Sequence, residues 1–176
     1  AGIRYTWLAD GEVRGYRFVC IRNRGQLDAV GTLLGNCLRR GDSGYDRRIA
    51  TDECRLFAIR KGKSGACVAL AEIRLMPHHD QGLPQLVQIR GPANQSVAQE
   101  VVQATYAWMG NQTSYDLPRP GTRRRWPPSA RTWQSIWQPY WDHFGPSSLL
   151  PTEPDDQTIA RFIANLDALK ALAGTA

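Results

Sequence analysis

The segment RLFAIRKGKSGACVALAEIRL, residues 55–75, decides the fold. It consists of two apolar runs, 55–60 and 66–75, joined by a short loop, 61–65, that contains two glycines. Two apolar runs around a loop of this length are typical of a β-hairpin. We therefore expect an antiparallel strand pair in the middle of the chain.

Two further segments predict strands that accompany this hairpin. The run LVQIR at 86–90 ends at Gly91-Pro92, and we expect it to add a third strand to the same sheet. Residues 3–22 predict a second hairpin, whose turn we expect at Asp10-Gly11, a favoured turn pair. The sequence therefore predicts a small, mainly antiparallel sheet.

Two amphipathic helices are predicted beside these strands. Apolar residues recur three and four positions apart over 26–38, which predicts a helix that buries Cys37 and ends at Gly41. A second helix of about four turns is predicted to start after a capping pair at Ser96. We expect residues 1–110 to form one α+β domain, with the sheet packed by helices.

The composition changes after residue 110. Residues 111–131 are rich in proline and arginine, which is typical of a linker or an extended arm. Residues 132–176 place aromatic and then aliphatic residues at helical spacing. We therefore expect a helical, Arg/Trp-rich C-terminal extension that packs on the core domain or on a partner.

Charge and composition narrow the classes of function. Twenty-two Lys and Arg against 16 Asp and Glu give a net charge of +6, which favours polyanionic partners such as nucleic acid. No apolar run approaches the roughly 20 residues that span a bilayer, and no secretory signal opens the chain. We expect a cytoplasmic protein without a membrane contact, and its start at Ala1 instead of Met suggests processing or missing flanking domains.

No motif predicts a metal or a cofactor. The four cysteines lie far apart and form no C-x-x-C pair, so we expect buried, reduced thiols instead of a zinc site. Two disulfides are the alternative for a secreted protein. The corner after the strand 86–90 lacks the complete glycine pattern of a nucleotide-binding loop.

Glu72 is a charged residue on an otherwise apolar strand face. If side chains alternate strictly along the strand 66–75, Val68 and Leu70 share a face with Glu72. In the next strand the corresponding face carries Leu86, Gln88 and Arg90. Glu72, Gln88 and Arg90 therefore converge if the two strands are neighbours.

Two interpretations of this convergence stay open. One is structural, a cross-strand Glu–Arg pair with a hydrogen bond from Gln88. The other is a ligand-binding or catalytic pocket, in which Glu72 is the general base and Arg90 stabilises a phosphate or an oxyanion. Asn94 either caps the helix that follows it or joins Arg90 in an anion-binding corner at the helix N-terminus.

Several segments together resemble the PcfJ-like proteins encoded by conjugative plasmids and phages. The matching segments are GTLLGNCL (31–38) followed by Tyr45, LFAIR (56–60), VALAEI (68–73) and QIRGPAN (88–94) before the Trp108 helix. The resemblance implies a mobile-element or conflict-system setting. The positions that carry the family signature are Cys37, Glu72, Gln88, Arg90, Gly91 and Asn94. The family pattern has His where this chain has Asn36, which weakens an interpretation of Cys37 as a His-assisted nucleophile.

The segment 119–141 carries the strongest sequence signal for binding. Its arginines interleave with aromatic residues, and the candidate contacts are Arg119, Arg123, Arg124, Arg125, Trp126 and Arg131. Arginine holds phosphates, and aromatic rings stack on exposed bases. The alternatives are tryptophans in a core beside a solvated arm, or docking on an acidic protein partner.

These observations predict a nucleic-acid-binding or nucleic-acid-processing domain of a mobile-element or toxin system. Whether it is an enzyme stays open. Its candidate catalytic residues are Glu72, Arg90, Gln88, Asn94 and Cys37. The alternatives are a secreted effector enzyme that uses Cys37 on a protein or small molecule, and a non-catalytic adaptor.

Overall fold

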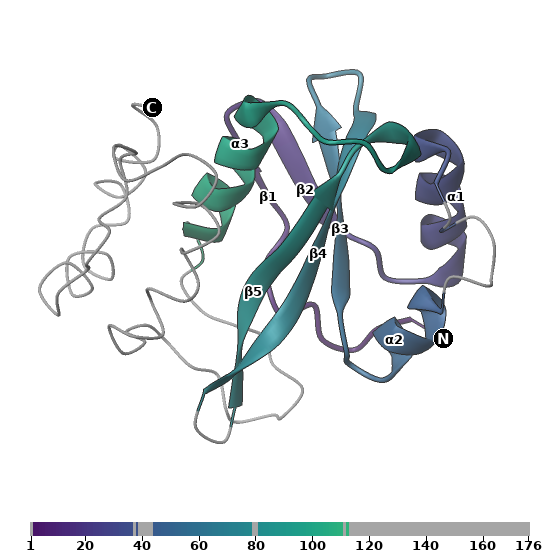
Figure 1. Ribbon diagram of the computed structural model, residues 1–176, viewed down its shortest axis with the longest axis vertical. Coiled ribbons are helices and arrows are strands. Elements are labelled where there is room, and N and C mark those ends of the chain that lie inside the picture. Colours follow the sequence, from purple (N-terminus) through teal and green to yellow (C-terminus); the bar gives the residue numbers. More distant parts are fainter. Residues whose placement is uncertain (1, 37, 39–43, 79–80, 111, 113–176) are drawn as a thin grey trace, which may run out of the picture.

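A computed structural model describes residues 2–36, 38, 44–78, 81–110 and 112, which form a five-stranded antiparallel sheet with helices on both faces (Figure 1). The strands lie in chain order, so each pairs with its neighbours in the sequence. The elements are β1 (Gly11–Val13), β2 (Tyr16–Cys20), α1 (Arg24–Leu34), α2 (Tyr45–Ala50), β3 (Arg55–Lys61), β4 (Ala66–His78), β5 (Gln81–Arg90), the 3₁₀ turn η3 (Pro92–Asn94) and α3 (Gln99–Gly110). This is the α+β architecture that the sequence predicts.

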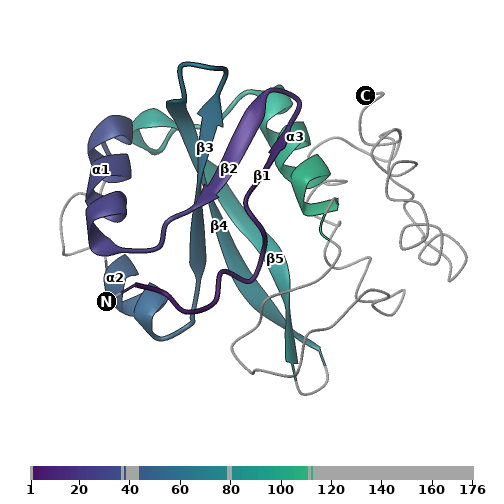
Figure 2. The ribbon, with the colours of Figure 1, turned by 180° about the vertical axis from the view of Figure 1, so that it is seen from behind.

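The two faces of the sheet are covered by different helices, as the opposite views of Figures 1 and 2 show. On one face α3 packs against the sheet, and the ring of Phe18 stacks on that of Trp108 with their centroids 4.7 Å apart. On the other face α1 and α2 bury a second apolar cluster that includes Leu34, Ile49 and Leu56. The candidate site described below lies on this second face.

The central hairpin of β3 and β4 is confirmed, and its strands pair from Arg55–Ile73 to Lys61–Ala66. The third predicted strand is also confirmed, because β5 pairs with β4. Both β4 and β5 are longer than the sequence predicts, since their pairing continues to His78 and Gln81. Together they form the outer part of the sheet.

Two β-bulges shift the predicted faces. The first leaves Val68 without a register partner, so Val68 packs on the α3 side and Cys67 packs on the side of α1. The second lies beside Glu72 and places Leu86 on the α3 side, opposite to Gln88. The predicted faces of Val68 and Leu86 are therefore wrong, because strict alternation fails where an extra residue enters one strand.

The first hairpin exists, but its predicted turn is wrong. The turn between β1 and β2 lies at Arg14-Gly15, whose φ angles are 55° and 79°. Two consecutive positive φ angles match the right-handed twist of the strands that such a turn joins. Asp10 has a different role, because its carboxylate accepts a hydrogen bond of 2.9 Å from the backbone N–H of Cys20.

The predicted helix boundaries also shift. Helix α1 begins at Arg24 after Asn23, whose side chain accepts a bond from the Gln26 N–H, and it ends at Gly35 with φ 59°. The predicted extension to residue 38 is therefore wrong, since a glycine that adopts the left-handed conformation ends the helix earlier. Helix α3 begins at Gln99, three residues beyond the predicted cap, so neither Ser96 nor Asn94 occupies its N-cap position.

Helix α2 was not predicted from the sequence. It has six residues and begins after Gly44, whose φ of 71° requires the conformational freedom of glycine. No helix among the described residues is long and apolar enough to cross a membrane. Of the predicted linker, 111–131, and the predicted helical extension, 132–176, only Gln112 belongs to the described residues.

Candidate functional site

Glu72 lies in β4 with only 1% of its surface exposed, and its carboxylate accepts four hydrogen bonds. Oε1 accepts from Arg48 Nη2 at 2.7 Å and from Arg74 Nε at 2.9 Å. Oε2 accepts from the Tyr45 hydroxyl at 2.8 Å and from Gln88 Nε2 at 2.7 Å. Each carboxylate oxygen therefore has two donors, which fills its acceptor capacity.

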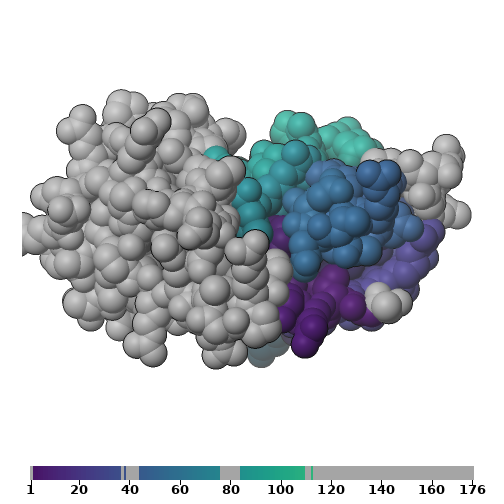
Figure 3. All heavy atoms as spheres, turned by 90° about the horizontal axis from the view of Figure 1, so that it is seen from below, coloured from purple at the N-terminus to yellow at the C-terminus, as the bar shows by residue number. Residues whose placement is uncertain are grey.

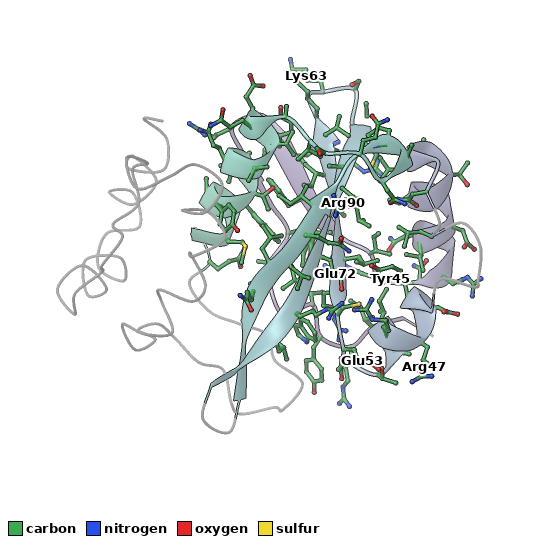
Figure 4. The ribbon with its side chains drawn as sticks, in the orientation of Figure 1. Tyr45, Arg47, Glu53, Lys63, Glu72 and Arg90 are labelled. Carbon is green, nitrogen blue, oxygen red and sulfur yellow. The ribbon has the colours of Figure 1, made fainter. Side chains whose placement is uncertain are left out.

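Three different elements bring these donors to Glu72. Gln88 is the register partner of Glu72 on β5, and Arg74 stands two residues further along β4. Tyr45 and Arg48 lie three residues apart on α2, so one helical turn presents both to the sheet. The Arg48 guanidinium also lies 4.8 Å from the centre of the Tyr45 ring, a cation–π contact that holds the two side chains together. Figure 4 shows Tyr45 and Glu72 pointing toward one another.

The donors control the ionisation of Glu72. Burial by itself raises the pKa of a carboxyl group, but the hydrogen bonds from Gln88, Arg74, Tyr45 and Arg48 outweigh burial and lower the pKa of Glu72 below its ordinary value. Burial and the hydrogen bond to Glu72 raise the pKa of Tyr45. Glu72 is therefore ionised at neutral pH, and the Tyr45 hydroxyl keeps its proton.

This arrangement favours the structural interpretation of Glu72 over a role as general base. A general base needs a lone pair directed at the proton that it removes. All the strong acceptor positions of Glu72 are already used within the protein. The pair that forms is not the expected one with Arg90, because in the described part of the chain Glu72 pairs with Arg48 and Arg74.

Arg90 lies beside this network, at the wall of a cavity of about 410 Å³. Its Nε donates to Gln88 Oε1 at 3.3 Å, so Gln88 links Arg90 to Glu72. We call this cavity the Arg90 pocket; its lining residues are Asn36, Leu38, Tyr45, Leu70, Glu72, Gln88, Arg90 and Asn94. Four predicted site residues, Glu72, Gln88, Arg90 and Asn94, therefore line one cavity.

The loop that carries Asn94 into the Arg90 pocket has an unusual backbone. Ala93 and Asn94 follow one another in the left-handed region, with φ angles of 53° and 60°. This conformation is unfavourable for alanine by about 1–2 kcal/mol. Such residues concentrate where a fixed loop shape serves a binding site. The predicted anion-binding corner, in which Asn94 and Arg90 meet a helix N-terminus, does not form, because α3 begins five residues beyond Asn94.

A second feature is a group of cations at the turns of the two hairpins. The turns are neighbours, since the Gly62 N–H donates to the Gly15 carbonyl at 3.1 Å, and both lie at the top of Figure 2. We call this group the hairpin-tip cluster; it consists of Arg14, Arg17, Arg60, Lys61 and Lys63. Arg17 on β2 is directly opposite Arg60 on β3. Like charges directly opposite one another destabilise a strand pair.

Arg60 and Lys61 of the hairpin-tip cluster contact neutral groups. Arg60 donates to the Gly65 carbonyl at 2.9 Å, and Lys61 lies 5.8 Å from the centre of the Tyr16 ring. Within the described ranges no ion pair joins Arg17, Arg60, Lys61 or Lys63 to a carboxylate, although Glu12 is the register partner of Arg17 on the other side. The positive charge of these four residues is not neutralised by contacts of this kind.

The opposite end of the molecule has a different charge pattern. A cavity of about 600 Å³ lies there between the N-terminal segment 2–5, α1 and α2, and Figure 3 shows this end from below, with the N-terminal residues in purple beside α2 in blue. Three of its four arginines, Arg22, Arg24 and Arg55, pair with carboxylates, namely Asp10, Asp46 and Asp52, and the fourth, Arg4, lies over the ring of Tyr5. Most of the positive charge at this larger cavity is therefore paired, unlike that of the hairpin tips.

Several predicted residues lie outside the described part of the chain. They are Cys37, Arg119, Arg123, Arg124, Arg125, Trp126 and Arg131. Asn36 and Leu38, which flank Cys37 in the sequence, both line the Arg90 pocket. The sequence analysis missed Arg48 and Arg74 as partners of Glu72, and it missed the hairpin-tip cluster, whose only sequence signal is the density of Lys and Arg around the loop 61–65.

The described cysteines and potential metal ligands form no metal centre. Cys20, Cys54 and Cys67 are free thiols, and burial raises the pKa of Cys20 to about 12 and that of Cys54 to about 11. Among the described residues no three His, Cys, Asp or Glu side chains are grouped as metal ligands. These thiols therefore remain protonated at neutral pH.

No family model matches the chain, and neither a curated protein nor a solved structure matches it with statistical significance.

Proposed function

We propose that this protein binds nucleic acid in the cytoplasm, through phosphate contacts made by the hairpin-tip cluster, and that it does so in a mobile-element setting. The observation that carries the proposal is the concentration of exposed and half-buried cations around the two neighbouring turns, four of which have no ion pair within the described residues. Phosphates supply the missing negative charge, and arginine suits them because its guanidinium binds two oxygens at once.

The position of Arg17 and Arg60 strengthens this proposal. Their opposition across β2 and β3 is unfavourable in the free protein, and an anion held between them relieves it. Binding to phosphates also releases counterions from the nucleic acid, which adds a favourable term at moderate salt. The net charge of +6 acts in the same direction at longer range.

The proposed function is binding without catalysis at Glu72. The four hydrogen bonds to its carboxylate assign it to holding Tyr45, Arg48 and Gln88 in place, instead of removing a proton. Buried thiols such as Cys20 and Cys54 are typical of proteins in a reducing compartment. The resemblance to PcfJ-like proteins supports the mobile-element setting.

The test is fluorescence anisotropy of a labelled single-stranded oligonucleotide titrated with the full chain over a range of salt concentrations. The variant is Arg17→Gln with Lys63→Gln, and the matched control is Arg47→Gln, a change of an exposed arginine on α2 that points away from the sheet (Figure 4). For single strands the slope of log K against log salt is about −0.7 per phosphate contact. Removing two contacts in the double variant therefore makes the slope less negative by about 1.4.

Two results would contradict the proposal. One is absence of binding by the wild-type chain even at low salt. The other is an unchanged slope in the double variant, which would move the phosphate contacts away from the hairpin tips. The control variant shows whether the loss of any surface charge weakens binding to the same degree.

A further inference from the structure

The polar groups of the Arg90 pocket differ in what they still offer to a ligand. The acceptors are largely used: Glu72 holds four donors, Gln88 Oε1 accepts from Arg90, and Asn36 Oδ1 accepts from the Leu38 N–H at 3.2 Å. Both N–H bonds of the Gln88 amide are directed at Glu72 and at the Tyr45 oxygen. Most hydrogen-bond acceptors of the pocket are therefore already bonded within the protein.

The groups that remain are mainly donors. Arg90 uses Nε for Gln88, and its two terminal nitrogens have no partner among the described residues. The Asn36 amide nitrogen and the side chain of Asn94 likewise have none there. A guanidinium and two amide groups with this inventory fit a ligand that only accepts hydrogen bonds, such as a phosphate group.

The charge around the pocket has the same sign. Glu72 and Glu53, which both pair with Arg48, contribute two negative charges, and Arg48, Arg74 and Arg90 contribute three positive charges, which leaves +1 by simple addition. Arg48 and Arg74 are held by Glu72, so Arg90 is the cation of this group that lines the pocket and keeps its terminal nitrogens for a ligand. A terminal phosphate carries more negative charge than a phosphate within a strand, because its second ionisation has a pKa near 6.

Arg17 and Arg60 of the hairpin-tip cluster lie on the same face of the sheet as the pocket, whereas Arg14 and Lys61 lie on the α3 side. Arg17 pairs with Arg60, and two residues along the strands Ala58 pairs with Leu70, which in turn pairs with Arg90. Arg90 is thus two strands across and two residues along from Arg60. With strands ~4.8 Å apart and a rise of ~3.4 Å per residue, the two Cα atoms are about 12 Å apart. Figure 4 shows Arg90 between Glu72 and the turn that carries Lys63.

We propose that the Arg90 pocket receives the terminal phosphate of a nucleic-acid strand whose backbone lies on the hairpin-tip cluster. This inference rests on the proposed function and adds the part of the strand that is recognised. The pocket is a cavity whose lining includes the buried side chains of Leu38 and Leu70, and a chain end enters a cavity more readily than a continuous backbone does. Arg90 and the Asn94 loop make the ionic and polar contacts, and Glu72 fixes Gln88 and thereby the Arg90 guanidinium.

The test compares three otherwise identical short single-stranded DNA probes, with a 5′-phosphate, a 3′-phosphate or hydroxyl groups at both ends. Binding to the full chain is measured by anisotropy with an internal label. We expect one phosphorylated probe to bind about tenfold more tightly than the hydroxyl-ended probe, the effect of one charge-assisted contact. Arg90→Gln removes this preference and changes the binding of the hydroxyl-ended probe less than twofold.

Arg47→Gln is the matched control, and it retains the preference. Equal binding of all three probes by the wild-type chain overturns the inference and leaves the proposed function intact. Binding of none of them overturns both. A preference that survives in Arg90→Gln places the terminal phosphate elsewhere and also overturns the inference.

A free mononucleotide separates two sources of the same phosphate group. We expect deoxyadenosine monophosphate to abolish the preference only at concentrations far above the probe, because it lacks the contacts with the hairpin tips. Competition at concentrations similar to that of the probe would identify a pocket for free nucleotides and overturn the assignment to a strand end.

Discussion

Replacing Glu72 by Gln tests whether the buried carboxylate organises the site. The substitution keeps the shape of the side chain and removes its charge. The amide oxygen can still accept from Arg48 and Arg74. The amide nitrogen then faces Tyr45, whose hydroxyl can rotate to accept, and the Gln88 amide, which has to turn its oxygen toward the new donor and give up its bond with Arg90. The main loss is therefore the charge assistance of the two arginine bonds.

The magnitude follows from the kind of hydrogen bond that is lost. A bond to a charged group contributes about 1.5–3 kcal/mol and a neutral one about 0.5–1.5 kcal/mol, so each arginine bond weakens by about 1–1.5 kcal/mol. The side chains of Arg48 and Arg74 are 24% and 49% exposed, so hydrogen bonds with water offset part of this loss of free energy. We expect Glu72→Gln to lower the free energy of unfolding by about 2 kcal/mol.

The assay is urea denaturation of the full chain, followed by tryptophan fluorescence. Glu53→Gln is the matched control, because Glu53 carries the same charge, is 49% exposed and pairs with Arg48 at 3.8 Å. We expect its effect to stay within about 0.5 kcal/mol. A loss at Glu72 no greater than that of this control would refute the reasoning.

The same pair of proteins gives a dependence on pH with a definite sign. The pKa of Glu72 is lower in the folded protein than its ordinary value of 4.5, so its contribution is present above pH 4.5 and is lost as the pH falls through the folded-state pKa. The difference in stability between wild type and Glu72→Gln should therefore be constant above about pH 5 and shrink in acid. A difference that grows in acid would contradict the lowered pKa.

Two other predictions concern buried groups. Iodoacetamide should not label Cys20 or Cys54 in the folded chain near pH 8, because burial raises the pKa of these thiols to about 12 and about 11. It should label both in urea. Rapid labelling without urea, detected by peptide mass spectrometry, would show that the two thiols are exposed or ionised. Arg55→Met should lower the free energy of unfolding, measured by urea denaturation, by about 3–5 kcal/mol. The reason is that the buried guanidinium donates to the carbonyls of Tyr5, Ile49 and Cys54 and pairs with Asp52. A loss below about 1 kcal/mol would show that these bonds contribute little.

The convergence of Glu72 and Gln88 could be predicted because it depends on pairing of neighbouring strands. It is retained although two bulges shift the sheet. One bulge precedes Leu70, and the other lies beyond the pair, at the side of Leu86. Between them the register from Leu70–Arg90 to Glu72–Gln88 keeps simple alternation, so the expected residues share a face.

The partners of Glu72 from α2 could not be predicted in the same way. A helix of six residues has fewer than two turns, so its sequence shows no apolar period from which a buried face can be identified. Its formation depends on contacts with the rest of the protein, such as the burial of Ile49 and the bonds of Tyr45 and Arg48 with Glu72. Tyr45 was singled out only by the resemblance to a family.

The hairpin-tip cluster shows a second limit of sequence reasoning. Arg17 and Arg60 lie 43 positions apart in the chain, and only the pairing of β2 with β3 brings them together. The arrangement could not be predicted from a first turn at Asp10-Gly11, because such a turn does not bring Gly15 beside the loop of the second hairpin. Arg14-Gly15 was a less evident turn pair than Asp10-Gly11, since arginine seldom adopts a positive φ.

The internal hydrogen bonds of the Arg90 pocket explain why one buried carboxylate affects the chemistry of groups that it does not touch. If Glu72 held fewer donors, Gln88 could turn its amide and release Arg90 from its Oε1, and the pocket would offer acceptors as well as donors to a ligand. Because Glu72 takes an N–H of Gln88, the Gln88 oxygen is directed at Arg90 and fixes its Nε. The two terminal nitrogens of the planar guanidinium are then left for a ligand, and such a pair of donors can bind two phosphate oxygens together.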